Sequence, residues 1–151
     1  MASKLDPFIA FPVATLKARG PRVVAELMSI VQARADNGEE TFADACSRLP
    51  KAWQATMLVA WAIGRLEEGR FLPEILQGLA EVDDRSLLIA ALKEIGEKTL
   101  ASAFVAADDV LDEPDQMWSG LGPPPAEDLS RLRKKVFVLV GSMSEPFPAA
   151  Q

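Results

Sequence analysis

Apolar positions recur with a helical period through most of the chain, and they fill one stretch almost completely. In residues 51–68, KAWQATMLVAWAIGRLEE, the apolar residues are too many for one helical stripe, and the run is too long for a typical strand. Pro50 precedes this stretch and Gly69 follows it, where proline and glycine favour the start and the end of a helix. The pattern therefore predicts a helix that is buried on most sides, with Trp53 and Trp61 in the core.

Shorter amphipathic segments flank this central helix. Because apolar residues recur three and four positions apart, we expect further helices at about residues 21–36, 41–49, 73–82, 85–95, 97–113 and 126–140. Thr41 and Asp44 have the spacing of a capping box, and Asp84 is suited to the N-cap of the helix that follows it. The run VFVLV at 136–140 also favours a strand, so the sequence leaves helix or strand open there.

Prolines and glycines interrupt the segments that lack this period. We interpret residues 1–20 as a proline-broken arm with a short helical turn, residues 113–125 as a loop, and residues 141–151 as a tail. The loop alone holds four prolines and two glycines. The sequence thus predicts one all-α domain over residues 1–151, a bundle of six to seven helices around the central helix.

The composition excludes several kinds of catalysis. Histidine and tyrosine are absent from the 151 residues, and Cys46 is the single cysteine. Ser/His/Asp and Cys/His catalysis and the imidazole ligands of common metal sites are therefore missing, and no internal disulfide can form. The chain has neither a signal-like start nor an apolar run long enough to span a membrane. We expect a bacterial cytoplasmic protein with no catalytic residues and no cofactor.

Acidic residues are concentrated in one part of the chain. Residues 67–128 hold fifteen acids and four bases, a net charge of −11, whereas the remainder carries +5. Between Lys98 and Arg131 there is no basic residue. Such a surface repels nucleic-acid phosphate and attracts a basic protein. We therefore expect a partner-binding acidic face made of Glu67, Glu68, Asp83, Asp84, Asp108, Asp109, Asp112, Glu113 and Asp115. A merely solubilising surface is the alternative.

Three of these acids also match a metal-binding spacing. Asp108, Asp109 and Asp112 have the DDxxD arrangement by which prenyl-diphosphate enzymes bind magnesium. Those enzymes need a larger helical barrel and a second carboxylate cluster, and Glu113-Pro114 looks like a helix end. We expect no metal site, and a carboxylate- or metal-dependent enzyme is the least favoured function.

Two motifs carry a resemblance to a known family. Gly69-Arg70-Phe71 stands where that family has an Asn-Gly-Gly-Phe turn, and AALKEIGEKTLASAFVAADDVL at 90–111 is similar to its Ala-Leu-x-x-Ile-Gly helix pair. Residues 49–111, about 60 of the 151, resemble this family of small all-helical bacterial domains of unknown function, which includes a DNA mimic. The Asn and one Gly of the turn are absent here, which places any activity of Gly69 and Phe71 in question.

The resemblance implies one partner class, and the charge pattern admits another. A DNA mimic spaces carboxylates like phosphates, so that a DNA-binding protein docks on it instead of on DNA. An immunity- or antitoxin-type inhibitor of a basic toxin needs the same acidic face. We expect no direct binding to nucleic acid and no binding to a membrane. The sequence leaves open which partner binds, whether the acids form one face, and whether the chain is a homodimer.

Overall fold

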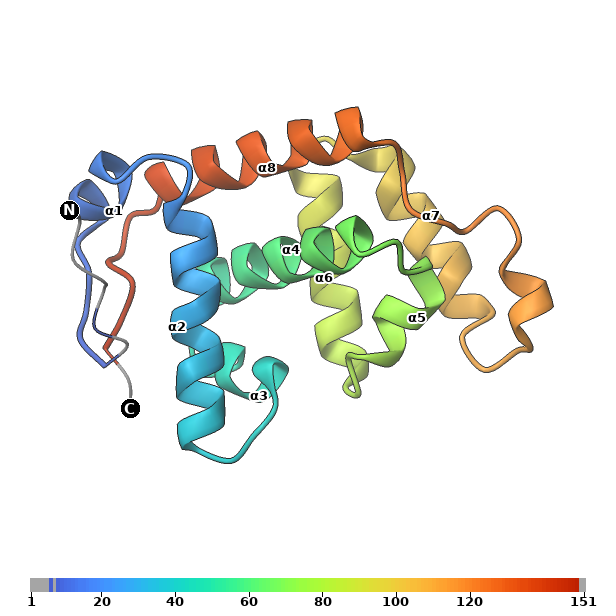
Figure 1. Cartoon of the computed structure of the whole chain (residues 1–151), viewed down its shortest axis with the longest axis horizontal. Helices are drawn as coiled ribbons and strands as arrows, with labels where there is room; N and C mark the ends of the chain where they lie inside the picture. Colours follow the sequence, from blue (N-terminus) through green and yellow to red (C-terminus); the bar gives the residue numbers. More distant parts are fainter. Residues whose placement is uncertain (1–5, 7, 150–151) are drawn as a thin grey trace. The chain divides into compact units, whose positions relative to one another are not determined.

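The computed structural model describes residues 6 and 8–149, and it is all-α (Figure 1). It is 65% helical, with no strand among the described residues, so the predicted fold class is confirmed. The elements are α1 (Val13–Ala18), α2 (Val23–Asn37), α3 (Phe42–Cys46), α4 (Lys51–Glu67), α5 (Leu72–Gln77), α6 (Val82–Glu94), α7 (Lys98–Asp109), the 3-10 helix η1 (Asp115–Trp118) and α8 (Ala126–Gly141). The first five residues of the predicted arm and the last two of the tail lie outside the described residues.

The chain divides into two compact units. Unit 1 comprises residues 1–60 and 134–151, and unit 2 comprises residues 61–133. The division falls within α4 and within α8, so each of these helices contributes residues to both units. The single domain expected from the sequence stays a prediction.

The predicted buried helix is α4. Its bounds match the expected 51–68 to within one residue, and its buried side chains include Met57, Leu58 and Leu66. Trp53 is 1% exposed, as expected of a core residue. Trp61 is only half-buried, because the crowded apolar run of α4 covers more of the helix surface than its neighbours enclose.

In unit 1 the described residues near the two ends of the chain, around Phe11 and Phe147, lie side by side (Figure 1). Phe11 and Phe147 form an antiparallel bridge, with N···O distances of 2.8 and 2.9 Å. The Phe147 ring packs edge-on against Trp53 with centroids 5.2 Å apart, and the Arg34 guanidinium lies 5.0 Å from its centroid. The predicted tail therefore contains a core residue, since Phe147 is 0% exposed.

Two local predictions in unit 1 are confirmed. The Thr41 hydroxyl accepts a hydrogen bond from the Asp44 amide at 3.1 Å, and the Asp44 carboxylate accepts one from the Thr41 amide, which completes the capping box of α3. The question of residues 136–140 is settled in favour of helix, because Val136 and Val140 are both buried and four residues apart on α8.

Unit 2 corrects the predicted start of one helix. The expected N-cap Asp84 lies inside α6, and the N-cap is Glu81, which has an extended backbone (φ −90°, ψ 134°). Asp83 and Asp84 instead occupy the first turn, where the positive end of the helix dipole favours carboxylates. Gly96 follows α6 with φ 84°, a left-handed conformation that commonly ends a helix.

The predicted loop is attached to unit 2 by fewer side chains than its apolar residues suggest. Trp118 Nε1 donates to the Val110 carbonyl at 3.1 Å, and the Leu121 carbonyl accepts from the Leu72 amide at 2.9 Å. Met117, another apolar residue of this loop, is instead 57% exposed. The short η1 turns this side chain outward.

Gly64→Ala should raise the free energy of unfolding by about 0.5–1 kcal/mol, because glycine inside a helix costs conformational entropy. Gly64 lies within α4, and a Cβ at this position would meet nothing within 4 Å. Urea denaturation measures the change. Gly69→Ala is the control of opposite sign, because Gly69 has φ 83° and alanine there is strained by about 1–2 kcal/mol. Destabilisation by Gly64→Ala would contradict the open space around α4 at this position.

Candidate acidic docking surface

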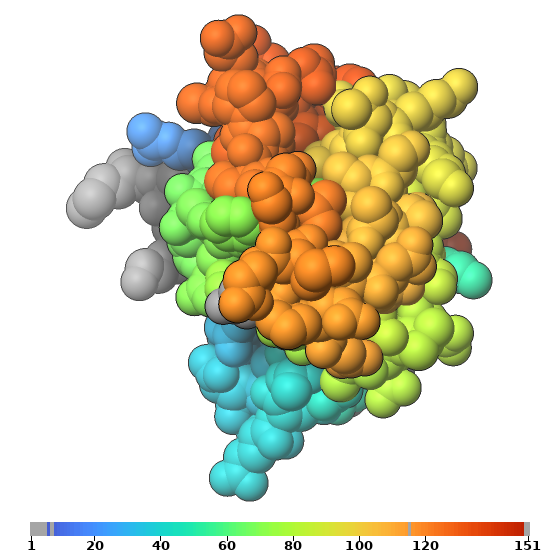
Figure 2. All heavy atoms as spheres, turned by 90° about the vertical axis from the view of Figure 1, so that its right-hand side faces the viewer, coloured from blue at the N-terminus to red at the C-terminus, as the bar shows by residue number. Residues whose placement is uncertain are grey.

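The start of α6 and the end of α7 meet in unit 2 through Arg85. Its Nε lies 3.2 Å from Asp108 Oδ1, and its Nη1 donates to the Leu79 carbonyl at 2.8 Å. The two helices also pack against each other. In Figure 2 the yellow-green atoms of the start of α6 lie beside the light orange atoms of the end of α7. Acidic residues that are far apart in sequence are therefore brought to one end of the α6–α7 pair.

Four carboxylates at this end remain without a basic partner among the residues that the structure describes. They are all exposed, and none has an ion pair among the described residues. Asp83 lies two residues before Arg85. Asp109 directly follows Asp108, and the other two acids lie four and five residues after Asp108. We call this group the acidic end; it consists of Asp83, Asp109, Asp112 and Glu113.

Acidic residues at the end of α7 are unfavourable for that helix. Asp108 and Asp109 close α7, which has no basic residue in its last turn. Carboxylates at a helix C-terminus face the negative end of the helix dipole, an arrangement that costs about 0.3–1 kcal/mol per charge. Arg85 offsets this cost at Asp108, whereas Asp109 has no such partner among the described residues. Asp109 therefore does not stabilise α7, and its presence has no explanation in the stability of this helix.

The two acids at the end of α4 are placed differently, because arginines neutralise both. Both carboxylate oxygens of Glu67 accept hydrogen bonds from Arg133, one of them from Nε at 2.7 Å. Glu68 accepts from Arg70 Nε at 2.9 Å and lies 3.4 Å from Arg65 Nη2. The hydrogen bond from Arg70 lowers the pKa of Glu68 below its ordinary value. These two predicted face residues thus carry little unbalanced charge.

Two other predicted face residues, Asp84 and Asp108, contribute less than expected. Asp84 is 8% exposed and is not a surface acid, because it lies on the inner side of the first turn of α6. Asp108 is paired with Arg85. Asp115 begins η1, but its side chain lies outside the described part of the structure.

The turn that carries the family resemblance connects α4 to α5. Gly69 has φ 83°, a left-handed conformation that glycine adopts without strain. Phe71 is the extended N-cap of α5, with 42% of its surface exposed, and a Cβ added to Gly122 would lie 3.7 Å from its ring. The turn thus has a structural role, and a binding role for Gly69 and Phe71 stays a prediction.

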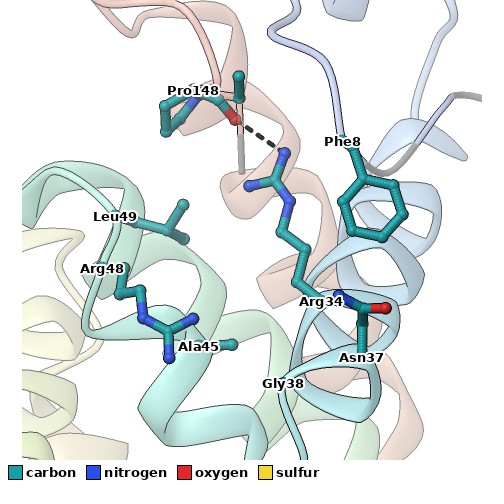
Figure 3. A pocket seen from close by; sticks show the side chains of 9 residues that line it. Phe8, Arg34, Asn37, Gly38, Ala45, Arg48, Leu49 and Pro148 are labelled. Atoms are coloured by element: carbon teal, nitrogen blue, oxygen red, sulfur yellow. Dashed lines mark hydrogen bonds between the residues drawn. The ribbon is translucent and has the colours of Figure 1, made fainter. Parts of the chain in front are cut away.

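A pocket of about 90 Å³ lies in unit 1 beside the joined chain ends (Figure 3). Arg34 and Arg48 both line it. Arg34 Nη2 donates to the Pro148 carbonyl at 2.8 Å, and burial lowers the pKa of its guanidinium below the ordinary value. Arg48 forms an ion pair with Glu40. Both arginines therefore serve the packing of unit 1.

The acids do not assemble a metal centre in the described part of the chain. No three His, Cys, Asp or Glu side chains there are placed to hold a metal ion, and Asp108, Asp109 and Asp112 are no exception. The single thiol, Cys46, is fully buried. None of the described helices combines the length and the apolar character needed to cross a membrane.

Comparisons with known proteins found no relative of this chain. No family model, no curated protein and no solved structure matches this chain. The resemblance carried by the turn and by residues 90–111 accordingly stays a prediction, and the candidate surface depends on its geometry and charge alone.

Proposed function

We propose that this chain is a non-catalytic interaction protein that binds a basic protein surface through the acidic end. One observation carries the proposal: four exposed carboxylates gather at one end of the α6–α7 pair without basic partners in the described part, although arginines neutralise other acids of unit 2. The absence of histidine and tyrosine from the sequence agrees with a function that needs no proton transfer.

The surroundings of the acidic end favour a protein as partner. Val82, next to Asp83, is 62% exposed, and Val105, one helical turn before Asp109, is 42% exposed. Residues four apart lie on the same face of a helix, so Val105 and Asp109 would meet a partner together. Exposed apolar groups among charges are typical of protein interfaces, in which apolar contact supplies affinity and charge supplies orientation and association rate.

DNA mimicry is the specific form of this function that we favour. Asp109 ends α7, and Asp112 and Glu113 follow within four residues in the turn after it. Duplex DNA carries one charge per about 1.7 Å of its axis. Carboxylates contributed by α6 as well as α7 bring the charge density closer to that of DNA. The partner would then be a DNA-binding protein, and the acidic end would occupy its phosphate-binding residues.

The triple variant Asp109→Asn, Asp112→Asn and Glu113→Gln tests the proposal. It removes three exposed charges with almost no change in side-chain volume. Affinity for the partner, first captured from the native cell and then purified, should fall about tenfold at low salt, and the salt dependence of binding should become shallower. Calorimetry at two salt concentrations measures both. Duplex DNA should compete with the wild-type chain if the partner is a DNA-binding protein, whereas a toxin would show no such competition.

A matched control removes the same charge elsewhere. Glu39→Gln, Glu94→Gln and Glu127→Gln replace three exposed acids that also lack an ion pair among the described residues. Glu94 closes α6 at the end opposite to Asp83. The control should keep more than half of the wild-type affinity. Equal losses in both triple variants would reduce the effect to net charge and would contradict a defined docking surface.

A further inference from the structure

A second cavity, in unit 2, differs in character from the acidic end. Its volume is about 160 Å³, and its walls come from Leu72, the start of α7, residues 120–124 and α8. Leu72 and Leu132 form a buried part of its lining, whereas Leu100 and Ala103 are half-buried. An apolar cavity of about 150 Å³ is large enough for benzene. The space therefore suits one small ring or a short branched chain.

Glycines leave this cavity accessible on the loop side. Gly120 and Gly122 line it together with Pro124. Gly120 has φ 82°, and a Cβ there would meet nothing within 4 Å. The loop therefore lines the cavity with backbone atoms and with Pro124. The two glycines contribute no side chain that would fill it.

The polar side of the cavity is a cluster of two carboxylates and one guanidinium. Glu97 is 7% exposed, and both of its oxygens accept hydrogen bonds from Arg131, at 3.0 Å each. Arg131 Nη1 also donates to Asp128 Oδ1 at 2.9 Å. The hydrogen bonds that Arg131 donates to Glu97 raise the pKa of Arg131 above its ordinary value, so the guanidinium stays charged. The formal charges of these three side chains thus sum to −1 beside an apolar space.

We propose that this cavity binds a compact apolar primary amine. The body of the ligand would contact Leu72, Leu100, Ala103 and Leu132, and its ammonium group would donate to the carboxylate of Asp128. Both carboxylate oxygens of Glu97 accept hydrogen bonds from Arg131. In Asp128 only Oδ1 accepts from Arg131, so the second oxygen would accept from the ligand. The excess negative charge of the cluster disfavours a carboxylate or a phosphate as ligand. This site is independent of the acidic end.

The test compares three probes of one size on the full chain by two-dimensional amide NMR. Benzylamine should shift the amides of residues 97–103 and 120–132, benzyl alcohol should shift the same amides with at least about threefold weaker affinity, and benzoate should not bind. Equal affinity for the amine and the alcohol would overturn the role of Asp128. Shifts scattered outside the cavity, or none with millimolar benzylamine, would overturn the site.

Two variants locate the ligand. Asp128→Asn should weaken benzylamine by at least about threefold and leave benzyl alcohol unchanged. Its matched control, Glu127→Gln, removes the neighbouring exposed charge and should change neither affinity. Ala103→Met should abolish the binding of both probes, because its side chain fills the cavity. Unchanged benzylamine affinity in Asp128→Asn would contradict the assignment even if Ala103→Met fails to fold.

Discussion

Trp53→Ala should lower the free energy of unfolding by about 3–5 kcal/mol, because the deletion of a buried aromatic ring leaves a cavity and also loses transfer energy. Trp53 is 1% exposed, and its ring packs edge-on against Phe147. Its Nε1 also donates to the Glu145 carbonyl at 3.1 Å. Alanine thus removes both an aromatic pair and a hydrogen bond to the last segment. Equilibrium denaturation in urea measures the loss.

Trp61→Ala is the matched control for this prediction. Trp61 lies on the same helix but is half-buried, so its truncation should cost less than about 2 kcal/mol. Equal losses for the two tryptophans, or a loss below about 1 kcal/mol for Trp53, would mean that the ends of the chain do not pack on Trp53 in solution.

Phe147→Ala should cost about 3–4 kcal/mol, although the residue stands in a proline-flanked segment four residues from the end of the sequence. Phe147 is 0% exposed, and it lies between the Trp53 ring and the Arg34 guanidinium. A truncated side chain would remove the apolar contact that covers Arg34 and Trp53 from one side. Thermal unfolding followed by circular dichroism measures the change in midpoint.

Phe8→Ala serves as the control at the other end of the chain. The Phe8 ring is 46% exposed, so its loss should change stability by less than about 1 kcal/mol. A Phe147→Ala variant as stable as Phe8→Ala would show that residues 145–149 are not a folded part of unit 1.

Local sequence signals predicted the helices because each signal acts over a few residues. The apolar run of α4 lies between Pro50 and Gly69, and the capping box needs only Thr41 and Asp44. Such features are formed by neighbours in the chain, so tertiary contacts do not need to be known. The start of α6 was misplaced because Asp83 and Asp84 fit a cap and a first turn equally well.

The burial of Phe147 could not be predicted from the residues around it in the sequence. Residues 141–151 show no apolar period, and two prolines flank this phenylalanine. Its partners Phe11, Arg34 and Trp53 lie in three distant parts of the sequence. A residue whose core position depends on long-range contacts leaves no periodic signal.

The sequence predicted the acidic region but not its pattern of neutralisation. The window of net charge −11 was evident from counting. Which acids keep their charge depends on pairs that are distant in sequence, such as Arg133 with Glu67 and Arg85 with Asp108. The absence of a base between Lys98 and Arg131 therefore did not leave Asp108 unpaired, because Arg85 reaches it from another helix.

Amide hydrogen exchange of the chain with and without its purified partner tests the proposed docking surface most directly. Slower exchange should appear at residues 81–85 and 105–113, which contain the acidic end and the exposed Val82 and Val105. Residues 34–48 of unit 1 should exchange at the same rate in both states. Protection confined to residues 34–48, with none at the acidic end, would contradict the proposal that this protein binds its partner through these carboxylates.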